Sequence, residues 1–197
     1  MRRARLLAAA TLLPALALVV AGCTHVATNT IGGDSVAPTG EQSATNDPQL
    51  VAEGLAFDPV IHDVDPDADC DGEAGRAPWE SFDRAAWPDL DVTAGETTLT
   101  CGNASGAGWR HIADGHAGDF GELAELVGAG WEDVAVFAID RALEQPTRVE
   151  EYRDDIVNYD VLVEYVNGGE AQRSWMVTVG VGLGSGHVIT SFPDEQR

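Results

Sequence analysis

The chain has 197 residues, with 33 acidic side chains, 11 arginines and no lysine, so its formal charge at pH 7 is −22. Such a chain is repelled by anionic lipid surfaces and by nucleic acid unless its arginines cluster. The composition therefore opposes a nucleic-acid function, whereas the same charge keeps an exported protein soluble.

The first 22 residues are a predicted signal peptide. A basic start precedes an apolar run over residues 6–20, which is short for a transmembrane helix of about 20 residues. The sequence Val20-Ala21-Gly22-Cys23 that follows resembles the lipobox of bacterial lipoproteins. That resemblance implies cleavage before Cys23, a diacylglycerol thioether on its sulfur and a fatty acyl chain such as palmitate on the new amino terminus. We expect an extracytoplasmic protein whose lipid anchors it to the bacterial cell membrane; a plain secretory peptide or a short membrane anchor is the alternative.

Three segments are expected after the signal. Residues 23–50 are rich in Thr, Ser, Asn, Gly and Pro, which is typical of a disordered tether. Residues 51–106 alternate short apolar pieces with Asp, Pro and Gly and predict a loop-rich lead-in. Residues 107–197 carry the regular patterns and predict the folded domain. Loss of the signal removes three arginines and moves the formal charge from −22 to −25.

Two cysteines are left once Cys23 carries lipid. Cys70 and Cys101 form an even pair in an oxidising compartment, so we predict a disulfide between them. Closing a loop of about 30 residues stabilises the fold by roughly 3 kcal/mol in the chain-entropy model. Neither cysteine has a CxxC partner or a closely spaced histidine, so no metal site is predicted.

Two helix patterns open the domain. In the first, Phe120, Leu123 and Val127 share one face, and glycines follow the run. The second helix lies in WEDVAVFAIDRALEQP and ends at Pro146.

The apolar period then changes to two. The stretches TRVEEY, IVNYDVLVEYV, SWMVTVGV and HVITSFP predict strands, and Asn167-Gly168-Gly169 predicts a hairpin turn between the second and the third. The predicted fold is α+β: two N-terminal helices followed by an antiparallel sheet of about four strands, with a loop-rich, disulfide-pinned lead-in.

His111 and His116 are the first candidates for chemistry. The imidazole group titrates near neutral pH, which suits a proton carrier. Five residues apart on one helix, the two rings would point about 140° apart, and this is not the i, i+4 spacing of a helical metal site. Asp114-Gly115 between them suggests a helix break that would let both rings reach one pocket. The alternative is that one or both histidines only cap or hydrogen-bond the helix.

The stretch GWRHIADGH, the two helices, the strand run and the final HVITSFP resemble the barnase, EndoU, colicin and RelE superfamily of ribonuclease toxin domains. The matching positions are Trp109, His111, Ile112, His116, Val188, Thr190, Phe192 and Pro193.

The resemblance implies metal-independent cleavage of an RNA substrate, without a cofactor. His111 and His116 would serve as base and acid, and the hydroxyl of Thr190, with that of Ser191, would donate to a phosphate oxygen. The supporting cation would be an arginine: Arg110 is adjacent to the motif, and Arg141, Arg148 and Arg173 are further candidates. A toxin domain also implies an immunity protein as partner.

A non-catalytic surface lipoprotein that binds a protein or envelope ligand is the alternative function. From residue 107 onward six arginines face seventeen acidic residues, a balance of −11, and no basic stripe is present.

An acidic run at residues 63–71 resembles a calcium loop. Asp67, Asp69, Asp71 and Gly72 fit its early positions, but Pro78 stands where the bidentate Glu is required. Loose calcium binding and a solvated acidic loop both remain open.

Overall fold

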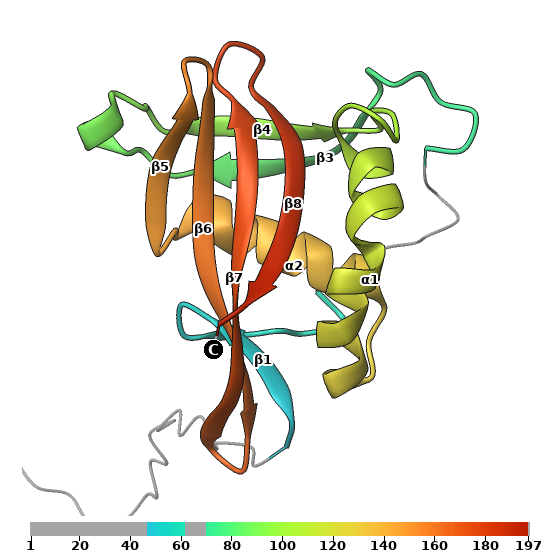
Figure 1. Cartoon of the computed structure of the whole chain (residues 1–197), viewed down its shortest axis with the longest axis vertical. Coiled ribbons are helices and arrows are strands. Elements are labelled where there is room, and N and C mark those ends of the chain that lie inside the picture. Colours follow the sequence, from blue (N-terminus) through green and yellow to red (C-terminus); the bar gives the residue numbers. More distant parts are fainter. Residues whose placement is uncertain (1–46, 62–69, 197) are drawn as a thin grey trace, which may run out of the picture. The chain divides into compact units, whose positions relative to one another are not determined.

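Figure 1 shows the computed structural model of the chain. The structure describes residues 47–61 and 70–196, which lie in one compact unit, Gln42–Arg197. The signal peptide, Cys23, most of the tether and the aspartates at 63–69 lie outside the described residues. Within the described ranges, neither helix is long and apolar enough to cross a membrane.

The described chain forms one curled, half-barrel sheet of eight strands and two helices. The strand order is β2-β1-β6-β7-β8-β4-β3, and β5 pairs with the free half of β6. The elements are β1 (Gln49–Ala52), β2 (Leu55–Ala56), β3 (Pro78–Arg84), β4 (Gly95–Thr100), α1 (Trp109–Val127), α2 (Trp131–Glu144), β5 (Arg148–Arg153), β6 (Ile156–Asn167), β7 (Glu170–Gly182) and β8 (His187–Glu195).

The predicted fold class is wrong. The molecule is mostly sheet, and its two helices follow four strands instead of opening the fold. The segment expected to be loop-rich supplies both edges of the sheet: β1 pairs with β6, and β4 pairs with β8 in parallel through Thr98 and His187. These strands are only two to seven residues long, too short to show a clear apolar alternation, and β1 and β4 join the sheet through partners distant in sequence.

The predicted elements after residue 107 are present. The central hairpin of β6 and β7 pairs over almost its whole length, from Ile156 opposite Gly182 to Asn167 opposite Glu170. Gly168 and Gly169, with φ of 64° and 82°, form its two-residue turn, which confirms the predicted hairpin.

Helix α2 lies inside the curl of the sheet. It packs on β3, β6 and β7, and Figure 1 shows it behind the long strands. Its apolar residues are almost fully buried, with Phe137 and Ile139 at 0 % exposure, and β6 meets it with Val157, Tyr159 and Val161. Because side chains alternate along a strand, the residues between these point to the opposite face of the sheet.

The start of α1 is fastened to several elements at once. Trp109 is buried between Trp79 of β3 and Trp131 of α2, with ring centroids 4.1 and 5.0 Å away. The amide of Gly108 donates to the carbonyl of Ile189 in β8 at 2.9 Å. Stacked aromatic rings at these distances contribute about 0.5–1.5 kcal/mol per pair beyond their buried area.

The turn that leads into α1 is compact and requires glycine. Gly102 and Gly108 have φ of 62° and 84°, and a Cβ at Gly102 would lie 1.7 Å from the carbonyl oxygen of Ala107. The predicted disulfide is confirmed: Cys70 and Cys101 are bonded and buried immediately before this turn. The bridge therefore fixes the segment that precedes the helix.

The buried hydroxyl of Tyr159 allows a test of how an unpaired polar group in the core affects stability. Its side chain is fully buried, its hydroxyl has no hydrogen-bond partner among the described residues, and burial raises its pKa, an effect that the nearby Arg84 partly offsets. Tyr159→Phe should leave the free energy of unfolding at pH 7 unchanged or raise it by up to about 1 kcal/mol, because it removes an unpaired polar group.

The raised pKa also predicts a pH effect. Wild type should lose stability as the pH rises above the ordinary phenol pKa toward the folded value, and the phenylalanine variant should not share this loss. Urea unfolding at pH 7 and pH 10.5 measures both effects. A loss above about 1.5 kcal/mol at pH 7 would instead mean that the hydroxyl binds an interior water.

Candidate functional site

A cavity of about 300 Å³ opens on the face of the sheet opposite α2. Its lining residues come from β6, β7 and β8, from the β5–β6 hairpin and from the first turn of α1. Figure 1 shows β5 beside β6 and α1 beside β8, at the two sides of these three strands. The polar and aromatic lining of the cavity consists of His111, Tyr152, Arg153, Asn158, Thr190 and Phe192.

The floor is hollow because β7 has no side chain at Gly180. A Cβ at this position would lie 3.4 Å from Cγ2 of Thr190 and 3.5 Å from Oδ1 of Asn158, both of which line the cavity. Gly180 pairs with Thr190 across the β7–β8 ladder. The missing side chain therefore gives an incoming group access to the polar atoms on both sides.

His111 projects into this cavity from the first turn of α1. Its Nδ1 lies 3.1 Å from the carbonyl oxygen of Ala104, in the turn that precedes the helix. Since a carbonyl oxygen only accepts, this bond places the proton on Nδ1 and leaves Nε2 as the proton acceptor of the neutral ring.

His116 lies next to His111, with ring centroids 5.8 Å apart and the rings nearly perpendicular. Its Nδ1 is 3.1 Å from Oδ2 of Asp119, and its ring packs 5.4 Å from that of Phe192. The helix runs unbroken through Gly115, so the predicted break is wrong. The two rings meet although no break turns them toward each other.

Thr190 and Ser191 lie on opposite faces of β8. Thr190 lines the cavity, and its hydroxyl is buried without a hydrogen-bond partner among the described residues. Ser191 is fully buried and pairs with Val179 of the core face. Strand alternation therefore brings Thr190 to the cavity that His111 lines and keeps Ser191 in the core.

Arg110 points away from the cavity into the structure. Its guanidinium donates to three backbone carbonyls: that of Gly102 at 3.0 Å, that of Glu73 at 2.9 Å and that of Cys70. These acceptors lie on both sides of the disulfide. The arginine adjacent to the histidine motif thus ties the disulfide loops to the helix.

The other predicted cations are engaged elsewhere. Arg141 is buried in α2 and pairs with Glu144. Arg173 pairs with Glu195 at 2.7 Å, a hydrogen bond that raises its pKa, and stacks over the ring of Trp175. Neither lines the cavity.

Arg148 pairs with a buried carboxylate beside the cavity. Its Nε and Nη2 lie 3.0 and 2.7 Å from Oδ2 of Asp160, which is 2 % exposed, and this pairing raises the pKa of the arginine. The hydroxyl of Thr178 donates to the other oxygen of Asp160 at 2.6 Å. A buried charge must be paired in this way, so the network fastens β5 to β6 and β7.

The cation that lines the cavity is Arg153, which sequence reasoning missed together with Tyr152 and Asn158. Arg153 makes no ion pair with a described residue and lies over the ring of Tyr152, 5.1 Å from its centroid. The one signal in the sequence was Asn158, a polar residue inside the apolar run of β6. Nothing in the sequence joins a hairpin residue to the histidines of a distant helix.

Among residues 47–61 and 70–196, no three or more His, Cys, Asp or Glu side chains are grouped so as to hold a metal ion. Of the proposed calcium loop, Asp71 and Gly72 are described and exposed. The remaining aspartates of that loop lie outside the described residues.

Comparison of the chain with protein families, with curated proteins and with solved structures found no match in any of the three. The site is therefore interpreted from its own geometry.

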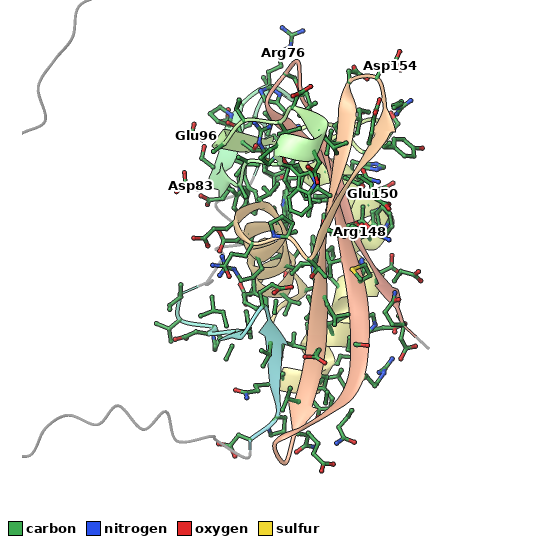
Figure 2. The ribbon with its side chains drawn as sticks, turned by 90° about the vertical axis from the view of Figure 1, so that its left-hand side faces the viewer. Arg76, Asp83, Glu96, Arg148, Glu150 and Asp154 are labelled. Carbon is green, nitrogen blue, oxygen red and sulfur yellow. A yellow bond between two sulfur atoms is a disulfide. The ribbon has the colours of Figure 1, made fainter. Side chains whose placement is uncertain are left out.

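Arg110→Ala should lower the free energy of unfolding by about 2–3 kcal/mol, since hydrogen bonds from a charged group each contribute about 1.5–3 kcal/mol. Denaturant unfolding measures the change, and Arg76→Ala, at an exposed arginine labelled in Figure 2, is the matched control. Unchanged stability of the Arg110 variant would contradict the structural role.

Proposed function

We propose that this cavity cleaves a phosphodiester bond next to a ribose 2′-hydroxyl, without a metal ion, as an endoribonuclease. The observation that carries the proposal is the meeting of two histidines with different hydrogen-bond partners at the edge of one cavity. His111 lines this cavity together with Arg153 and Thr190, and His116 packs on Phe192 of the same lining. A base, an acid, a cation and a hydrogen-bond donor are the groups that such a cleavage needs.

His111 suits the role of general base. Its Nδ1 proton is engaged by the carbonyl of Ala104, so Nε2 is free to accept the proton of the 2′-hydroxyl. The 2′-oxygen then forms a bond to phosphorus.

His116 suits the role of general acid. The carboxylate of Asp119 accepts from Nδ1 and balances the positive charge of the protonated ring, which leaves the Nε2 proton for transfer. As the bond from phosphorus to the 5′-oxygen breaks, that oxygen takes this proton. The products are a 2′,3′-cyclic phosphate and a free 5′-hydroxyl.

Arg153 and Thr190 supply the contacts for the phosphate. The guanidinium compensates the charge that builds up on the phosphorane oxygens, and the hydroxyl donates to one of them. Thr190 is half-buried, and its hydroxyl oxygen is buried without a hydrogen-bond partner among the described residues, so a phosphate oxygen reached by rotation of this side chain would give it one. The amide of Asn158 lines the same space.

Cleavage of ribonucleotide phosphodiesters, from dinucleoside monophosphates to long RNA, in the presence of EDTA is the test of this proposal. Wild type should cleave, and His111→Ala and His116→Ala should each lose about 10²–10⁴-fold in kcat/KM. The matched control is His187→Ala at the start of β8, outside the cavity lining, which should retain activity.

Circular dichroism establishes that all variants are folded. Absence of cleavage of every one of these substrates by folded wild type would reject the enzyme and favour the non-catalytic binding protein. Activity that EDTA abolishes would reject the metal-independent mechanism.

Gly180→Ala tests the cavity itself. The added methyl group fits at ordinary contact distance but narrows the floor between Thr190 and Asn158, so KM should rise several-fold while the unfolding midpoint stays near that of wild type. Gly184→Ala, in the β7–β8 turn with open space around it, is the matched control. Unchanged kinetics for Gly180→Ala would place the substrate elsewhere.

A further inference from the structure

We infer that the substrate of this site is a short ribonucleotide with a single phosphodiester, such as a dinucleoside monophosphate, and not a long RNA strand. The inference rests on the proposed function and adds the substrate class. It follows from the distribution of charge around the cavity.

The positive charge at the site is confined to the cavity. Arg153 lines it, and none of the lining residues is a carboxylate. The guanidinium of Arg110 is turned away to backbone carbonyls. Arg148 pairs with Asp160 and Glu150, at 2.7 and 3.5 Å. The site therefore offers compensation for one phosphate.

Carboxylates follow the cavity along β8, in the direction of the C-terminus. Asp194 lies two residues beyond Phe192, a distance of about 7 Å along a strand. With Glu195 and with Asp119 and Glu122 of α1 it lines a second hollow of about 140 Å³. Arg173 is held by Glu195 and Glu122, and His116 is paired with Asp119.

The opposite side of the cavity is acidic as well. Figure 2 shows Glu150 on β5 and Asp154 at the tip of the β5–β6 hairpin. Between them in the sequence stand Tyr152 and Arg153, which line the cavity. A strand that leaves the cavity in either direction therefore meets negative charge.

Carboxylates this close to the cavity repel the flanking phosphates of a longer substrate even in salt solution. The Debye length is about 10 Å at 0.1 M salt, so phosphates on either side of the bound one would interact with these carboxylates. A dinucleoside monophosphate has no flanking phosphates. The cavity volume of about 300 Å³ is also at the lower end of ligand pockets, roughly 300–1,000 Å³.

The test compares kcat/KM of the whole protein for a dinucleoside monophosphate and, per bond, for an unstructured 20-nucleotide RNA. At 10 mM NaCl the dinucleotide should be preferred at least about tenfold. At 200 mM NaCl the value for the oligonucleotide should rise about tenfold because salt screens the repulsion, and that for the dinucleotide should change less than about twofold.

Variants that remove carboxylates test which side chains cause the discrimination against the oligonucleotide. Asp154→Asn combined with Asp194→Asn should raise the oligonucleotide value several-fold at low salt and leave the dinucleotide value unchanged. The matched control is Asp83→Asn with Glu96→Gln, an exposed cross-strand pair on β3 and β4 that Figure 2 shows on the other side of the molecule. This control variant removes two negative charges as well, and it should leave kcat/KM unchanged for both the dinucleotide and the oligonucleotide.

Preference for the oligonucleotide, or an oligonucleotide rate that falls with salt, would overturn the substrate class and leave the proposed ribonuclease intact. Failure to cleave either substrate would overturn both.

Discussion

The anchoring of the first turn of α1 is the constraint on which the site depends. The disulfide holds the segment before the helix, the guanidinium of Arg110 binds backbone carbonyls on both sides of it, and the amide of Gly108 is bonded to β8. Ala104, which accepts from His111, lies within the same turn. The ring of His111 is therefore held between a cross-linked turn and the sheet, and its orientation does not depend on the rest of the helix.

The second constraint is the burial of α2 in the curl of the sheet. It commits one face of β6, β7 and β8 to apolar packing and leaves the other face for polar side chains. On that free face Asp160 is nearly buried and must be paired, which draws in Arg148 and Thr178. The same network fixes the edge strand whose hairpin carries Arg153. The packing of α2 on one face of the sheet and the ion pair of Asp160 on the other thus determine where the cavity lies.

The charge of the chain acts at two scales. The formal charge of −22 sets the long-range field, which repels polyanions. Close to the cavity, ion pairs occupy Arg148 and Arg173, whereas Arg153 has no carboxylate partner among the described residues. A strongly acidic protein can therefore still offer one positive site, because local pairing decides which cations remain available.

The sequence by itself determined the elements whose signal is local: the helix patterns after residue 107, the strands that follow, the Asn-Gly-Gly hairpin and the pairing of two cysteines with no other partner. It also brought His111, His116 and Thr190 to attention: His111 and Thr190 line one cavity, and the ring of His116 lies beside that of His111. It failed for strands β1 to β4 and for the fold class, because strands this short are recognised only from the pairing that joins β1 to β6 and β4 to β8, far apart in sequence. Only the tertiary structure decided that Arg110 binds backbone carbonyls, that Ser191 faces the core and that Arg153 lines the cavity. Periodicity describes a residue's own strand or helix, whereas these placements follow from how separate elements pack.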